Sequence, residues 1–545
     1  MIVLHIGALF LALGLTPWLL ARRLAPTRDT VGILACWGAI MVGLNVLIPV
    51  TLHLLHIQIT ATTLSASHLI AGLVAVAVSR LGPRKALEPL PRSVLLSSLL
   101  FATLVIPVTH IAGIDTYKWQ DLAGNLAVEG RISWFIHPLS LLGFTPRSYS
   151  SAQPLVLATI EMMGHTGVDW GFYILSLTFG LTGLAGAWLL GRRLLGSDRL
   201  AGWFAFFYIF SPVFMRYNYW ATGRGLLLAL LPLYLLILLR LASPSNLKSA
   251  ICNLHSFLLL TVLLALSHKA GLIGAILIPM VFLASPVLVL LRGRWGLLLG
   301  LLAVLVIGFS LTGGDAVTLG YRLLTRFGWL VPLAALGLYA APGQFISPAA
   351  RAMLAGGFAT LVLSCTPDMY GALLALPFVT TLAATGLAAL PARPIPPLIK
   401  ILTVLTALVI VANQAKDSPS ESVYRAALFL EQYDPEGPYR IEAPGKTRPR
   451  MQAYVSGCPR FAVGSGSAPE PTLARPPQWT GTLALDARHW IDYLRTMIGL
   501  RGASTDWYGS GDKVYYVTVA GEGTAPPDAK LLFTHGNVKV YGPSF

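Results

Sequence analysis

A succession of apolar stretches runs from the first residues to about residue 413 and constrains the fold more than any other feature. About 14 of these stretches are long enough, or nearly so, to cross a hydrocarbon layer that needs roughly 20 helical residues. The composition agrees, because 55% of the 545 residues are hydrophobic and only 11% are charged. A soluble chain carries about 25% charged residues. The sequence therefore predicts a polytopic α-helical membrane protein and excludes an ordinary soluble one.

The predicted spans differ in length, and several are short for a bilayer. The first could be a signal peptide, but Arg22 and Arg23 follow it where small residues would mark a cleavage site, so we expect a retained helix. The predicted spans are 2–21, 31–54, 60–79, 93–111, 171–190, 201–216, 225–241, 250–266, 271–291, 295–312, 328–342, 352–365, 371–390 and 398–413.

Charges are distributed unequally between the two sets of alternating loops. One set carries 17 basic and three acidic residues, whereas the opposite loops before residue 414 carry eight basic and seven acidic residues. The positive-inside rule assigns the first set to the cytoplasm of a multi-pass plasma-membrane protein, with both termini outside. This orientation explains the net charge of +16 without a nucleic-acid partner. The four cysteines show no spacing typical of a metal site or a disulfide framework.

Three parts follow along the chain. Residues 1–92 are predicted to form N-terminal transmembrane helices, and residues 93–413 a second set with a long exterior loop at 112–170. Residues 414–545 hold 27 of the 62 charged residues and predict an extracytoplasmic α/β domain. Its predicted helices are Ser420 to Gln432 and Asp486 to Met497, and its predicted strands are Tyr439 to Glu442, Thr480 to Leu485, Lys513 to Val519 and Val538 to Tyr541.

The long exterior loop places a carboxylate, Asp115, within a few residues of the predicted membrane exit. A carboxylate is costly there unless it is paired or used, so Asp115 is the first candidate for a functional group. The alternative is that Asp115 pairs with Lys118 one helical turn later and caps an interfacial helix.

Further charged groups recur at the exterior ends of other spans, and we expect them to converge on one cavity. Arginine grips a phosphate bidentately and stabilises charge on a departing oxygen, while a nearby carboxylate can take a proton from an attacking hydroxyl. The alternative for each cation is snorkelling toward lipid headgroups, which we favour for Arg322 and Arg326. The remaining groups in question are Arg216, Arg224, His268, Lys269 and Asp368.

The order of these features resembles the GT-C superfamily of integral-membrane glycosyltransferases, which use polyprenyl-phosphate-linked sugars. The similar segments are Asp115 to Asp121, Glu129-Gly130, Tyr149 to Pro154, Gly164 to Gly167, Thr222 to Pro232 and Ser267 to Lys269, all within residues 93–413. The resemblance implies a GT-C-like catalytic core in which Asp115 is the catalytic base. It also implies that Arg224, His268 and Lys269 hold the lipid phosphate. We expect Lys118, Asp121 and Arg216 to bind the substrate as well.

Together these features predict an inverting transfer of a sugar from a polyprenyl-phosphate donor to a hydroxyl of a glycan, lipid or protein acceptor at the exterior face. No metal is required if Arg and Lys supply the countercharge, although Asp121, Glu161 or Asp368 could help hold a divalent ion. Residues 216–224 contain no carboxylate, so this exterior loop has no Asp-x-Asp motif that could bind a metal. Asp506-Trp507-Tyr508-Gly509 changes the order of the Trp-Trp-Asp signature of oligosaccharyltransferases, which argues against a sequon acceptor.

Two other classes of function remain open. A transporter or lipid flippase would also need many spans, but such folds often have two related halves, and the sequence shows none. A receptor or assembly subunit would use the spans only as an anchor, for which far fewer helices suffice.

Overall fold

The structure is a computed structural model, and it describes most of the helical part and a smaller share of the C-terminal part. The described residues are 2–25, 29–80, 87–105, 114–132, 134–135, 141–143, 150–165, 168–242, 247–284, 306, 316–340, 370–390, 395–415, 421–434, 439–444, 447–452, 455 and 513–542.

The described part of the chain is mostly helical and contains eight helices that are long and apolar enough to cross a membrane. A ninth span is possible if α15 (Ala316–Phe327) and α16 (Leu330–Ala340), which meet at a bend of 95°, are counted as one. The chain is therefore a multi-pass membrane protein. The predicted span 352–365 lies outside the described residues, and of 295–312 only Val306 is described.

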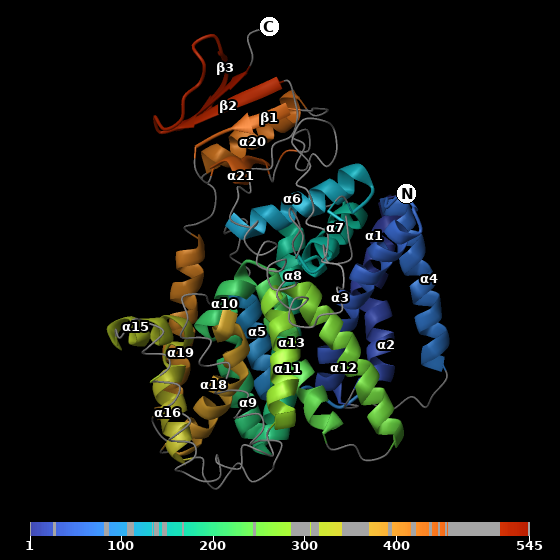
Figure 1. Cartoon of the computed structure of the whole chain (residues 1–545), viewed down its shortest axis with the longest axis vertical. Helices are drawn as coiled ribbons and strands as arrows, with labels where there is room; N and C mark the ends of the chain where they lie inside the picture. Colours follow the sequence, from blue (N-terminus) through green and yellow to red (C-terminus); the bar gives the residue numbers. More distant parts are fainter. Residues whose placement is uncertain are drawn as a thin grey trace, which may run out of the picture.

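The N-terminal helices pack on one flank of the bundle (Figure 1). The first span is interrupted by a π-helical turn, η1, whose carbonyl groups receive side-chain hydrogen bonds from the next helix. Trp37 Nε1 donates to the Leu13 oxygen at 2.9 Å and Asn45 Nδ2 to the Ala12 oxygen at 3.5 Å. The elements are α1 (Ile2–Phe10), η1 (Leu11–Leu15), α2 (Thr16–Leu24), α3 (Thr30–Leu54) and α4 (Ala61–Arg80).

The centre of the bundle is built from α8, α11 and α18, whose residues are mostly buried. Small residues allow close helix packing, as in α16 and α18, where a side chain at Gly337 would overlap the Leu382 carbonyl and one at Gly386 the Leu333 carbonyl. The helices of this part are α5 (Arg92–Val105), α8 (Val168–Leu195), α9 (Asp198–Ile209), α10 (Pro212–Tyr219), α11 (Gly223–Leu241), α12 (Leu247–Ser267), α13 (Lys269–Ala284), α18 (Tyr370–Ala388) and α19 (Ile395–Ala415).

The prediction of one span at 201–216 was wrong, because two short helices occupy this segment. α9 ends at Ile209, and α10 begins at Pro212 with Ser211 as its N-cap. The Ser211 hydroxyl oxygen accepts from the Phe214 N–H at 3.2 Å. Proline has no N–H to continue a preceding helix, so the chain turns here.

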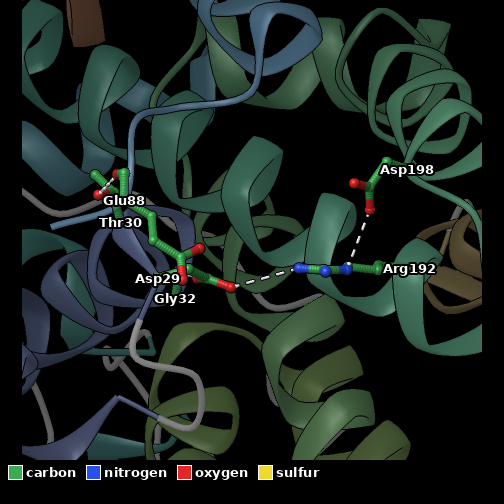
Figure 2. A network of polar contacts seen from close by, with 6 residues as sticks. All are labelled: Asp29, Thr30, Gly32, Glu88, Arg192 and Asp198. Atoms are coloured by element: carbon green, nitrogen blue, oxygen red, sulfur yellow. Dashed lines mark hydrogen bonds and ion pairs between the residues drawn. The ribbon is translucent and has the colours of Figure 1, made fainter.

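A polar network joins four segments at the end of the bundle far from the chain termini (Figure 2). Asp29 caps α3 by accepting from the Gly32 N–H at 2.6 Å, and its other oxygen lies 3.7 Å from Arg192 at the end of α8. Arg192 also pairs with Asp198 of α9 at 3.1 Å. The Thr30 hydroxyl donates to the Glu88 carbonyl ahead of α5. The network therefore fixes the ends of α3, α8 and α9 relative to each other.

This network gives a stability prediction. Asp29→Ala is expected to lower the free energy of unfolding by about 1 kcal/mol, because it removes a helix N-cap. Asp198→Ala is expected to cost less than about 0.5 kcal/mol, because its ion pair is largely exposed to solvent. Thermal midpoints of the two purified variants check this order, and equal midpoints would contradict it.

The C-terminal part forms a four-stranded sheet in the order β1-β2-β4-β3. β1 (Tyr439–Glu442) and β2 (Lys513–Val519) pair in parallel, while β3 (Lys530–His535) and β4 (Val538–Gly542) form an antiparallel hairpin beside β2. The predicted strands β1, β2 and β4 are confirmed, and β3 was missed. Thr480 to Leu485 and Asp486 to Met497 lie outside the described residues.

Helix α20 (Glu421–Tyr433) confirms the predicted tail helix and covers the sheet with an apolar face. At its end Asp434 accepts a hydrogen bond from the Tyr515 hydroxyl at 2.9 Å. Burial raises the pKa of Tyr515, and Asp434 raises it further. The division of the chain at residues 92 and 413 stays a prediction.

Helix α6 (Ile114–Glu129) lies between the helical bundle and the C-terminal sheet (Figure 1). α21 (Thr447–Gln452) contacts it from the sheet side, and α7 (Ala152–Gly164) contacts it from the bundle side. The N-terminus of the chain lies at this same end of the bundle (Figure 1). The long loop thus contributes two helices at this end.

Candidate functional site

The candidate site is formed where two helix-to-helix turns meet beneath α6. One turn joins α10 to α11, and the other joins α12 to α13. Thr222 caps α11, because its hydroxyl oxygen accepts from the Gly225 N–H at 3.2 Å. His268 stands between α12 and α13, and its Nδ1 accepts from the Ala270 N–H at 3.1 Å. Both turns therefore direct a helix N-terminus toward the same region.

Glycine brings these two turns into backbone contact. A Cβ atom at position 223 would overlap the Ser267 carbonyl oxygen and would lie 4.0 Å from Trp119 Cζ2 of α6. The backbones of α11 and α12 can approach this closely only because residue 223 has no side chain. Gly223 thus places the N-terminus of α11, the end of α12 and the buried Trp119 ring together.

Arg224 and His268 form the central pair of the site. Arg224 Nε lies 3.4 Å from His268 Nε2, and the imidazole is buried. The Arg224 Nε–H donates toward Nε2, so His268 helps to hold the Arg224 side chain in place. A planar guanidinium that is held in place can grip a phosphate through two N–H donors.

Aromatic rings link this pair to Arg216. The Arg224 guanidinium lies over the Tyr217 ring at 5.1 Å, and the Arg216 guanidinium lies over the Trp220 ring at 5.4 Å. The two rings meet edge to face, with their centroids 6.1 Å apart. Cation–π contacts hold both guanidinium groups in place. The sequence pattern predicted the cations of this site, whereas the rings that hold them are seen only in the structure.

The end of each helix adds positive potential to this region. α11 begins at Gly223 and α13 at Lys269, and the aligned peptide dipoles of a helix place partial positive charge at its N-terminus. Arg224 and Lys269 are at or next to these termini. Helix N-termini with cationic side chains bind phosphate groups well. The structure places Arg224, His268 and Lys269 at two adjacent turns, and their binding of a phosphate stays a prediction.

Asp115, Lys118 and Asp121 lie on α6, but their side chains are outside the described part of the structure. Asp115 stands one helical turn before Trp119, the residue that approaches Gly223. The expected meeting of Asp115 with the cations, and its alternative pairing with Lys118, both stay predictions. Asp368 and Asp506 to Gly509 also lie outside the described residues.

Arg326 was expected to snorkel toward headgroups, and the structure instead buries it. Only 4% of the residue is exposed, whereas Val317, Tyr321 and Leu324 of the same helix are exposed. α15 packs against α10, where Gly328 approaches Pro212. A side chain at position 328 would lie 3.2 Å from the Pro212 ring. Arg326 is therefore an additional buried cation beside the helix that carries Arg216.

No group of three or more His, Cys, Asp or Glu residues converges as a metal site within the described residues. Glu161, one of the predicted metal ligands, lies on α7 and faces α8. Its Cγ is 3.9 Å from the point that a Cβ atom would occupy at Gly171. Metal binding by Asp121, Glu161 or Asp368 stays a prediction.

The close approach at Gly223 gives a second stability prediction. Gly223→Ala is expected to force α11 and α12 apart, at a cost of about 1–3 kcal/mol, and to separate Arg224 from His268. The thermal midpoint of the purified variant measures this cost. Gly320→Ala is the matched control, because nothing lies within 4 Å of that position in α15. Equal midpoints for both variants would refute the packing argument.

No protein-family model matches the chain, and no curated protein matches it. Among solved structures, the chain is similar to the archaeal oligosaccharyltransferase AglB from Archaeoglobus fulgidus in complex with an inhibitory peptide and a dolichol-phosphate. That match has 13% identity and a TM-score of 0.44, and covers 79% of this chain and 69% of the other. The apo form of the oligosaccharyltransferase from the same organism matches with 13% identity and a TM-score of 0.43, covering 68% of this chain and 64% of the other.

Proposed function

We propose that the protein is a membrane glycosyltransferase that transfers a sugar from a polyprenyl-phosphate-linked donor to an acceptor hydroxyl, with inversion, at the extracytoplasmic face. One observation carries the proposal. Arg224 and His268 lie 3.4 Å apart between the N-termini of α11 and α13, next to α6, on which Asp115 is located.

The cationic side of the site suits the leaving phosphate. A guanidinium and two helix N-termini together stabilise the negative charge that grows on a phosphate oxygen as the glycosidic bond breaks. Lys269 and Arg216 add positive charge at the same turns. A site at the helix ends near one membrane face also suits a donor whose polyprenyl tail stays in the lipid.

Asp115 on α6 is the catalytic base in this proposal. In this proposal the Asp115 carboxylate takes the proton of the acceptor hydroxyl, and the hydroxyl oxygen forms a bond to the anomeric carbon. The bond from that carbon to the phosphate oxygen breaks, and the phosphate leaves toward Arg224 and His268. Attack opposite the leaving group inverts the anomeric configuration. Lys118 and Asp121, also on α6, would contact the sugar or the acceptor.

The placement of the remaining parts supports an acceptor that arrives from outside the membrane. The 17 basic residues of one set of loops assign the opposite, α6-bearing side to the exterior. The contact between α21 and α6 puts the C-terminal domain beside the proposed catalytic helix. We propose that this domain orients the acceptor or covers the site.

The test is a transfer assay with the full chain in lipid nanodiscs. Labelled polyprenyl-phosphate and polyprenyl-diphosphate sugars would be offered with a glycan, a lipid or a peptide as acceptor, and the anomeric configuration of the product would be determined. Transfer with inversion supports the proposal. Movement of an intact labelled lipid across proteoliposomes without any transfer would refute it in favour of a lipid transporter.

A further inference from the structure

We propose that the N-terminal helices α1 to α4 position the helix that carries Asp115, through contacts of His53 and the turn 55–60 with the end of α6. The consequence for catalysis rests on the proposed function, whereas the structural attachment does not. Residues 1–92 precede the part of the chain that resembles glycosyltransferases, and the attachment gives these additional helices a role.

The turn between α3 and α4 contacts the C-terminal end of α6 through the backbone. The Ile59 N–H donates to the Gly130 carbonyl at 2.7 Å, and Ile59 is completely buried. Gly130 has φ of +65°, and a Cβ atom there would lie 2.7 Å from Gln58 Cγ. Only glycine satisfies both the left-handed backbone and the close approach. The end of α6 is thus fitted against this turn.

His53 of α3 makes a second contact with the segment that follows α6, at Ile132, two residues after Gly130. Its Nδ1 accepts from the Ile132 N–H at 3.3 Å, and its ring packs against Phe135 with centroids 5.0 Å apart. Ile132 and Trp134 are almost fully buried, and Trp134 Nε1 donates to the Ser151 hydroxyl at the start of α7. The segment after α6 is therefore held between α3 and α7.

The far end of α7 is also attached to the N-terminal helices. His5 Nδ1 of α1 lies 2.9 Å from Nε2 of His165, and the two rings are stacked with centroids 5.2 Å apart. His165 ends α7 in a left-handed conformation, with φ of +48°. The long exterior loop thus contacts the N-terminal helices at the end of α6 and at the end of α7.

These contacts matter because α6 lies across the end of the bundle rather than within it (Figure 1). The middle of α6 packs on the bundle through Trp119, Leu122, Ala123 and Leu126, which are buried. The contacts at Gly130 and Ile132 fix its C-terminal end. Misplacement of a catalytic group by about 1 Å can reduce a rate by about 10²-fold. His53 is therefore a positioning residue that acts through the backbone of α6 and touches no substrate.

The test compares two replacements of His53 in the full chain. His53→Phe keeps a ring against Phe135 but removes the acceptor, whereas His53→Asn places an amide oxygen near the position of Nδ1. We expect amide hydrogen exchange in residues 125–135 to become about fivefold faster in His53→Phe and to return to the wild-type rate in His53→Asn. His56→Asn, an exposed position in the same turn, is the control and leaves exchange unchanged.

Activity is the second readout. With the sugar-transfer assay, His53→Phe is expected to lower kcat about 10- to 100-fold without changing KM for the donor, and His53→Asn to restore most of it. Should His53→Phe fail to fold, Gly130→Ala disturbs the same contact from the opposite side and is expected to give the same exchange pattern.

Two results would overturn the inference. The first is unchanged exchange in residues 125–135 of both His53→Phe and Gly130→Ala. The second is faster exchange with unaltered kcat, which would show that the attachment positions nothing. Absence of sugar transfer in the wild-type protein would instead refute the proposed function, while the exchange measurement would still decide whether α3 holds α6.

Discussion

Replacement of Asp115 by asparagine is expected to reduce sugar transfer by about 10²- to 10⁴-fold while the protein folds normally. Asparagine has nearly the same shape as aspartate but cannot accept the proton of the attacking hydroxyl. The loss is therefore expected in kcat, with KM for the lipid-linked donor little changed, because the donor phosphate is bound by the cations. Initial rates at saturating donor, measured in nanodiscs, separate the two parameters.

The matched control is Asp198→Asn, which changes a carboxylate of the network at the opposite end of the bundle (Figure 2). It is expected to keep the wild-type rate. An Asp115→Asn variant with full activity would remove Asp115 from the role of base. In that case Asp121 on the same helix would be the next carboxylate to test.

Arg224→Gln is expected to lower kcat/KM by about 10²- to 10³-fold, because it removes a charged donor from the side that receives the leaving phosphate. Arg224→Lys should recover only part of the loss, since an ammonium group cannot form the planar pair of hydrogen bonds of a guanidinium. Binding of polyprenyl phosphate without a sugar gives an independent measurement. Both Arg224 variants are expected to bind it more weakly than the wild type.

The control for this charge is Arg425→Gln on α20, where the arginine is exposed and pairs with Glu421 of the same helix. Its affinity for polyprenyl phosphate should equal that of the wild type. If Arg224→Gln also bound the lipid phosphate with wild-type affinity, the pair Arg224 and His268 would not be the phosphate site. The buried Arg326 would then be the first alternative cation.

Local patterns predicted much of the fold because the hydrophobic pattern of most helices and strands can be recognised within the segment itself. The spans containing α3, α8 and α11 were visible as apolar runs, and β1 and β2 were predicted at the residues where they occur. β3 was missed because Lys530–His535 does not alternate between buried and exposed positions, and its partner β4 defines it. The break before Pro212 was also overlooked, although proline marked it in the sequence.

The candidate site was likewise predicted only in part from the sequence. The sequence indicated Arg224, His268 and Lys269 because a polar or charged residue at the end of an apolar run can be recognised without knowing which other segments lie nearby. It could not show that Arg224 and His268, 44 residues apart, lie in contact, nor that Arg326 is buried.

The apolar runs and the loop charges by themselves determined that this chain is a multi-pass helical membrane protein, because burial in lipid depends on local hydrophobicity. Only the tertiary structure decided that His53 meets Ile132, 79 residues away, and that Gly223 brings α11 onto α12. Such contacts depend on how helices pack at their ends. That packing is set by shape complementarity between distant segments, which no local pattern records.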